Sequence, residues 1–186
     1  MKLEEAKTIA DNWLQSLSPF CERIEIAGSI RRGKPEVKDI EIVCVPKIEK
    51  QPDLFGFEAL KVNLLEFYID SLLADNAIRI HKRGPRYKKI SLSEGICIDL
   101  FIVLPPSQWG VQFLIRTGPA DFSHWIVTSK QSGGALPSNL KIKDGAVWHG
   151  VKKIETPEET DFFKVIGVNY LEPSQRQAHW IGAKKS

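Results

Sequence analysis

A chain of 186 residues with 42% hydrophobic side chains can bury a core, and this length allows one domain or two small subdomains. Its apolar runs fall short of the roughly 18 residues of a membrane span, and its acidic start does not resemble a secretion signal, so no membrane contact is expected. Three cysteines without a CxxC pair predict neither a disulfide nor a zinc site, and a formal net charge of +3 is too small to diagnose a nucleic-acid partner.

The first part of the chain predicts helices and strands in alternation. Apolar residues recur every three or four positions over residues 3–17, which predicts an amphipathic helix. Residues 23–28 and 39–46 are rich in β-branched side chains and predict two strands separated by a polar segment. Helical spacing returns over residues 59–76. Two further strands are predicted over residues 87–92 and 96–104.

After residue 117 the pattern predicts a second, smaller unit. Residues 120–130 have helical spacing, and residues 140–150 predict a hairpin with an Asp-Gly turn. In TPEETDFFKVIG, Thr156 is predicted as the N-cap of a helix, with Glu159 completing a capping box and a glycine ending the helix.

Three acidic residues carry the first candidate chemistry. Alternation along the strand over residues 39–46 places Asp39 and Glu41 on one face. Asp99 lies within the apolar run ICIDLFIV, where an unpaired buried carboxylate would cost roughly several kcal/mol. If the two strands are neighbours, the three acids converge on a site whose oxygen ligands suit Mg²⁺ or Mn²⁺ rather than a soft metal. The alternative is an exposed acidic edge, with Asp99 paired to a lysine.

Before these acids, the segment AGSIRRG combines a predicted strand end with two arginines. Gly28 and Ser29 open a short predicted helix, whose free N–H groups can hold a phosphate. Arg31 and Arg32 lie within reach for charge-assisted hydrogen bonds to the same group. Because phosphates and divalent cations act together in phosphoryl transfer, the segment predicts a triphosphate held beside metal ions on the three acids.

The densest basic segment is RIHKRGPRYKK, residues 79–89. Its charges predict either a solvated face or a patch that tracks nucleic-acid phosphates. Under the second interpretation, the DNA-binding residues are Lys82, Arg83, Arg86 and Lys88.

The order of these motifs resembles a known family. GSIRRG, followed eleven residues after Gly28 by D-I-E and then by I-D-L at Asp99, resembles the nucleotidyltransferase superfamily, and GSxRRG more narrowly the family X DNA polymerases. RTGPADF, the hairpin KIKDGAVW with the helix after it, and GVNYLEPSQR resemble later segments of that family. The resemblance covers residues 3–178 and implies an α+β fold. That fold is a nucleotidyltransferase palm with a mixed sheet flanked by helices (residues 1–117) plus a small C-terminal thumb-like α+β subdomain (residues 118–186).

The resemblance implies a DNA polymerase that adds deoxynucleotides from dNTPs to a primer 3′-hydroxyl by two-metal-ion catalysis, in short gap filling during DNA repair. Asp39, Glu41 and Asp99 would be the catalytic residues and would bind two Mg²⁺ or Mn²⁺ ions. The expected partners are dNTP and a primer-template or gapped duplex DNA, and the expected state is a monomer in the cytoplasm of a bacterium or of a virus-infected cell. The expected nucleotide- and triphosphate-binding residues are Gly28, Ser29, Arg32, Lys38, Thr117 and Gly118.

The sequence departs from the family pattern at several positions. Glu41 stands where family X polymerases usually have Asp, and Cys97 stands where members carry an arginine. Ile115–Arg116 replaces an aromatic pair, and Ser123 and Val127 replace polar and basic residues near the nascent base pair, which implies low fidelity. The chain would be a minimal member without the lyase and helix-hairpin-helix domains of larger relatives, so the basic segment becomes the main expected DNA contact.

The family often bends its backbone after the T-G glycine with a cis peptide. A bond before proline adopts cis at a cost of about 0.5–1 kcal/mol, against about 2.5–4 kcal/mol before other residues. We therefore predict a cis Gly118–Pro119 bond in this chain.

Two other classes of function stay open on the sequence. A non-templated nucleotidyltransferase would modify an RNA end, a protein hydroxyl or a small alcohol, and an inactive module would bind nucleic acid without transfer. The T-G and thumb-like segments speak against the first, and the presence of all three acids speaks against the second.

Overall fold

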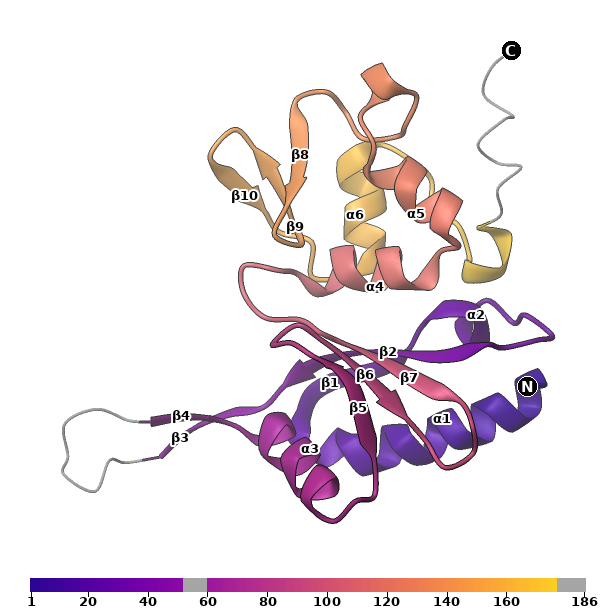
Figure 1. Cartoon of the computed structure of the whole chain (residues 1–186). Coiled ribbons are helices and arrows are strands. Elements are labelled where there is room, and N and C mark those ends of the chain that lie inside the picture. The colour runs from indigo at the N-terminus through magenta and orange to yellow at the C-terminus, as the bar shows by residue number, and fades with distance from the viewer. Residues whose placement is uncertain (52–59, 177–186) are drawn as a thin grey trace.

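A five-stranded sheet organises the first part of the chain in the computed structural model, which describes residues 1–51 and 60–176 (Figure 1). The strand order is β1-β2-β7-β6-β5. β2 and β7 run parallel, whereas the other neighbouring strands are antiparallel, so the sheet is mixed. The strands are β1 (Cys21–Ile26), β2 (Asp39–Pro46), β5 (Arg79–Arg83), β6 (Tyr87–Ser91) and β7 (Cys97–Ile102).

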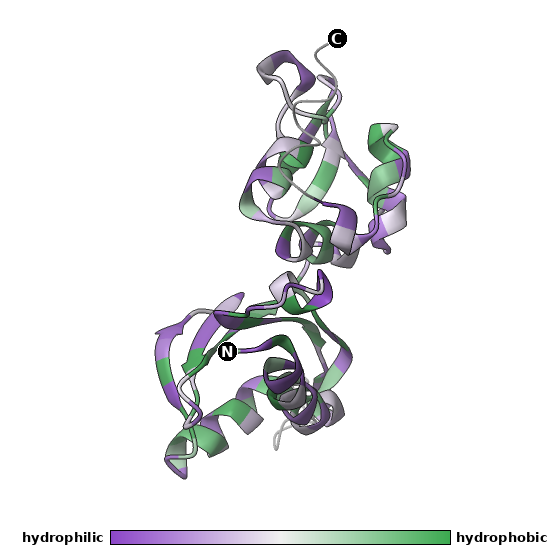
Figure 2. Ribbon diagram, turned by 90° about the vertical axis from the view of Figure 1, so that its right-hand side faces the viewer, coloured by the Kyte–Doolittle hydropathy of each residue, from purple (hydrophilic) through white to green (hydrophobic). Residues whose placement is uncertain are grey.

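Helices cover both faces of this sheet. α1 (Leu3–Leu17) and α3 (Leu64–Ala74) lie on one face, and α4 (Trp109–Thr117) lies on the other (Figure 1). Figure 2 shows the sheet curving around α1, with hydrophobic and hydrophilic residues alternating along its strands. The inner residues, such as Ile40 and Ile98, pack against α1 and α3 in the main core. The same alternation sends the polar side chains of β2 and β7, together with Tyr87 and Lys89 of β6, to the face on which α4 lies.

A second core lies beyond α4 and gathers the elements of the C-terminal part. Phe122, Val147 and Phe163 are among its buried members, and Val111 and Leu114 of α4 also contribute to it. α4 thus packs on two sides, and a domain boundary after residue 117 stays a prediction. The elements of this part are α5 (Ala120–Val127), β8 (Leu140–Lys143), β9 (Ala146–His149), β10 (Lys152–Ile154) and α6 (Glu159–Ile166).

Residues 59–76, predicted as one helix, contain a strand as well. β4 (Leu60–Asn63) pairs with β3 (Ile48–Gln51), and α3 begins only at Leu64. The side chain of Asn63 accepts a hydrogen bond from the backbone N–H of Glu66 at 3.1 Å. This N-cap fixes the start of the helix, which hydrophobic spacing alone had placed too early.

α6 begins later than predicted. Its N-cap is Glu158, which forms a capping box with Asp161. Thr156, the predicted cap, is buried and donates its hydroxyl to Gln108 Oε1 at 2.9 Å, so it is not available to the helix. Gly167 ends the helix in the left-handed region with a φ of 70°, as predicted.

The predicted cis Gly118–Pro119 bond is wrong. Within the described residues the cis bond is Pro105–Pro106, and Gly118–Pro119 is trans. Gly118 and Pro119 both adopt extended dihedrals, with ψ of 156°, and these alone redirect the chain from α4 into α5. No helix within the described residues is long and apolar enough to cross a membrane.

Candidate active site

The three acids meet where β2 and β7 run side by side. In the parallel register Glu41 lies opposite Asp99, and Asp39 lies opposite Cys97. Because paired residues on neighbouring strands share a face, all three carboxylates lie on the face opposite α1 and α3. The expectation that the two strands are neighbours is therefore confirmed.

The carboxylates of Asp39 and Asp99 are close enough to Glu41 to affect its ionisation. Burial, reinforced by repulsion from Asp39 and Asp99, raises the pKa of Glu41 to about 7. Attraction to Arg32 and a hydrogen bond from the backbone of Ser29 oppose this rise without cancelling it. The site therefore concentrates negative charge that a cation would relieve.

Asp99 has two partners on β6. The hydroxyl of Tyr87 donates a hydrogen bond to Asp99 Oδ1 at 2.7 Å, and Lys89 Nζ lies 3.5 Å from the same oxygen. Burial and this hydrogen bond raise the pKa of Tyr87 to about 12. The alternative in which Asp99 pairs with a lysine is thus realised in part, and this lysine lies on the same face of the sheet as the other two acids.

Gly28, Ser29 and Arg32 lie next to Glu41. Gly28 has a φ of 59°, and a Cβ at this position would collide with the Glu41 carboxylate, so the close approach requires glycine. The Oγ of Ser29 and the Nε of Arg32 are buried without a hydrogen-bond partner among the described residues. Buried donors of this kind are normally satisfied, so their position beside the acids points to an oxygen-rich ligand.

Three other expected nucleotide contacts occupy different environments. Thr117 is fully buried, its hydroxyl accepts a hydrogen bond from Arg31 at 2.7 Å, and its carbonyl accepts one from Arg32 at 2.5 Å. The polar atoms of Thr117 thus contact Arg31 of α2 (Gly28–Arg31) and Arg32, the residue that follows α2, and its role in nucleotide binding stays a prediction. Gly118 joins α4 to α5, and Lys38 is exposed directly before Asp39.

Strand alternation divides the basic segment between the two faces of the sheet. Lys88 is 1% exposed and binds Glu66 of α3 with an Nζ–Oε2 distance of 2.7 Å. Arg83 pairs with Glu66 and Asp70 of the same helix. Both residues therefore neutralise acidic side chains of α3, on the face of the sheet opposite the three acids.

The remaining basic residues lie toward the acids. Lys82 is exposed and lies opposite Lys89, the partner of Asp99. Arg86, also exposed, donates to the carbonyl oxygens of Pro105 at 3.0 Å and Asp144 at 3.4 Å. Lys82 and Arg86 therefore remain available as phosphate contacts.

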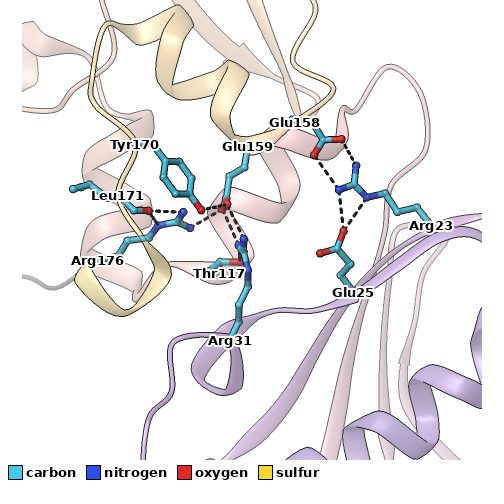
Figure 3. Close-up of polar contacts among 9 residues, drawn as sticks. All are labelled: Arg23, Glu25, Arg31, Thr117, Glu158, Glu159, Tyr170, Leu171 and Arg176. Carbon is cyan, nitrogen blue, oxygen red and sulfur yellow. Dashed lines mark hydrogen bonds and ion pairs between the residues drawn. The ribbon is translucent and has the colours of Figure 1, made fainter.

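An ion-pair network ties α2 to α6 (Figure 3). Glu159 is 5% exposed and accepts hydrogen bonds from Arg31 at 2.9 and 3.0 Å and from Arg176 at 2.6 Å. Arg23 binds Glu158 through a second, more exposed pair. Sequence reasoning missed this network, because Arg31 is 128 residues from Glu159, Arg23 is 135 residues from Glu158, and no periodic pattern links them.

The donor chemistry of the acids fits a hard divalent cation. Carboxylate oxygens are the ligands that Mg²⁺ and Mn²⁺ prefer, and crowding of the three groups favours a bound cation. As they stand, no three His, Cys, Asp or Glu side chains in the described part of the chain are arranged to hold a metal ion. The contacts of Asp99 with Tyr87 and Lys89 are both made by Oδ1.

This α+β arrangement, with a mixed sheet flanked by helices, is compatible with a nucleotidyltransferase-like fold. No protein-family model matches the chain. The chain is 26% identical over 168 residues to DNA polymerase lambda of Rattus norvegicus. The match covers 80% of this chain but 28% of that polymerase, so the chain spans less than a third of the length of this relative. The similarity supports a distant relationship to the family X polymerases.

Proposed function

We propose that the chain is a divalent-cation-dependent nucleotidyltransferase that extends a DNA primer 3′-hydroxyl with deoxynucleotides, as a family X type polymerase in short gap filling. The observation that carries this proposal is the convergence of the three acids on one face beside the unpartnered polar atoms of Ser29 and Arg32. Nucleotidyl transfer needs carboxylates that can bind metal ions next to donors that can bind the triphosphate. The similarity to DNA polymerase lambda supports the same class.

The residues of the site divide the work in the proposed reaction. Ser29 and Arg32 donate hydrogen bonds to the triphosphate and orient its α-phosphorus toward the acids. Asp39, Glu41 and Asp99 would hold two Mg²⁺ ions, and these would supply activation of the 3′-hydroxyl and charge neutralisation of the leaving pyrophosphate. Glu41, with a pKa of about 7, releases its proton to act as a ligand.

A primer-extension assay separates the candidate functions. The protein is incubated with a one-nucleotide-gapped duplex, a primer-template and a single strand, each with Mg²⁺ or Mn²⁺ and single dNTPs or NTPs. Template-matched addition supports the proposed polymerase. Template-independent addition replaces it with the non-templated transferase, and DNA binding without addition replaces it with the inactive binding module.

The division of the basic segment between the two faces of the sheet predicts which of its charged side chains bind DNA. Arg79 and Lys82 are exposed on the face of β5 that carries the acids, so Arg79→Gln with Lys82→Gln should flatten the salt dependence of DNA binding. Each lost phosphate contact lowers the slope of log K against log salt by about 0.9, so the pair should lower it by about 2. Fluorescence anisotropy with a labelled gapped duplex measures this slope.

Arg83→Gln is the matched control, because Arg83 lies on the same strand but pairs with Asp70 across the opposite face. Its slope should equal that of the unchanged protein. If both variants changed the salt slope equally, the whole segment would be interpreted as a solvated face and not as a DNA contact.

A further inference from the structure

A cavity of about 550 Å³ lies beside the candidate active site, between the β5-β6-β7 edge of the sheet and α4. Its volume is within the roughly 300–1,000 Å³ of typical small-ligand sites. Three of its lining residues are cationic, Lys82, Arg86 and Arg116, and none of the described lining residues is acidic. Tyr87 and Phe101 form an aromatic wall, with ring centroids 5.2 Å apart.

Arg116 has the least satisfied donors in this cavity. Its guanidinium stacks on Phe101, 4.0 Å from the ring centroid. Its Nε is buried, and no described residue accepts a hydrogen bond from it or forms an ion pair with it. Burial lowers the pKa of Arg116, and attraction to Glu41 opposes this only in part. A buried donor without a partner destabilises the protein, so the Nε of this arginine calls for an acceptor that the described residues do not supply.

The other two cations form no ion pair with a described residue either. Lys82 forms no hydrogen bond or ion pair with any described residue, and Arg86 donates only to the carbonyl oxygens of Pro105 and Asp144. A carbonyl oxygen carries no net charge, so the positive charge of Arg86 persists. Three such charges around one cavity attract and hold an anion.

We propose that this cavity is a second phosphate site, which binds the phosphate of a nucleotide, free or at the end of a strand, without a metal ion. A terminal phosphate offers up to two charges and three acceptor oxygens, which suit the fork of Arg116 flanked by Lys82 and Arg86. The sugar and base lie against the wall of Tyr87 and Phe101. The identity of the ligand as a nucleotide rests on the proposed function, whereas the phosphate site does not.

Isothermal titration calorimetry in EDTA tests the site, with dAMP, inorganic phosphate and a 5′-phosphorylated octathymidylate as separate titrants. Arg116→Gln should weaken binding at least about tenfold, because a hydrogen bond to a charged group is lost. Lys82→Gln should weaken it less, and Arg32→Gln should leave it unchanged. Binding of dAMP identifies a free nucleotide as the ligand, and binding of the oligonucleotide alone identifies a strand end.

Two results would overturn the proposal. One is the absence of binding by all three titrants; the other is binding that Arg32→Gln abolishes and Arg116→Gln leaves intact, which would place the phosphate at the triphosphate site. Should Arg116→Gln unfold, Arg116→Lys and the exposed Lys82→Gln carry the test. If inorganic phosphate binds through Arg116 while no nucleotide addition is detected, the second site stands and the proposed function fails.

Discussion

Asp99→Asn should lower the rate of nucleotide addition more than about 100-fold. Mutating a residue that only hydrogen-bonds to a metal ligand typically lowers metal affinity or activity by roughly 10–100-fold, and the loss of a ligand should exceed this. The substitution keeps the shape of the side chain and an oxygen that accepts the hydrogen bond of Tyr87. It removes the charge that a divalent cation requires at the centre of the carboxylate cluster. Single-turnover extension of a labelled primer measures the rate, and Mn²⁺ binding followed by electron paramagnetic resonance measures the metal affinity.

Cys97→Ser is the matched control for this variant. Cys97 lies two residues earlier on β7, on the same face, and opposite Asp39. A change of a few-fold or less is expected, because no step of the proposed reaction uses its thiol. Full activity in Asp99→Asn would falsify the assignment of the metal ligands, whatever the control shows.

Elements with one buried face could be predicted closely from sequence. α1 spans Leu3–Leu17, as its periodicity indicates, because it contacts the core along a single face. β2 spans Asp39–Pro46, as predicted, although Val43 also packs into a small core on the other face of the sheet. No helix was predicted over α4. Its residues Trp109 and Phe113 pack toward the sheet, whereas Val111 and Leu114 pack into the second core. A helix buried on two sides shows no single apolar stripe, so its period is hidden.

The acids could be predicted for local reasons, but their neighbours could not. Alternation placed Asp39 and Glu41 together, and the apolar surroundings of Asp99 made its charge conspicuous. Period-two alternation also separates Lys88 from Lys89, although charge density alone predicts one solvated face or one phosphate-binding patch for the whole segment. The burial of Lys88 depends on Glu66 of α3, a contact that no local pattern encodes. Arg116 was noted only as a departure from a family pattern, because its unmet donors become evident only in three dimensions.

Glu159→Gln should lower the free energy of unfolding by about 3–5 kcal/mol, the cost of breaking a buried ion pair by removing one charge. Arg176 is fully buried and Arg31 is largely so, and both would keep a positive charge with a weaker acceptor. For a chain of this size the melting temperature should fall by about 6–20 °C, at 2–4 °C per kcal/mol. Differential scanning calorimetry at neutral pH measures the shift.

The effect should also depend on pH. Burial would raise the pKa of Glu159, but hydrogen bonds from Arg176 and Arg31 outweigh it and hold that pKa below its ordinary value. The unfolded chain therefore binds the extra proton first as the pH falls below about 4.5, and the stabilisation by Glu159 is progressively lost. The difference in the free energy of unfolding between the unchanged protein and Glu159→Gln should be full at pH 7 and should become smaller in acid.

The control variant is Glu158→Gln, which breaks the exposed pair with Arg23 and should lower the free energy of unfolding by only about 0–1 kcal/mol. Equal melting temperatures for both variants would mean that the buried network does not hold α2, and with it Arg32, against α6.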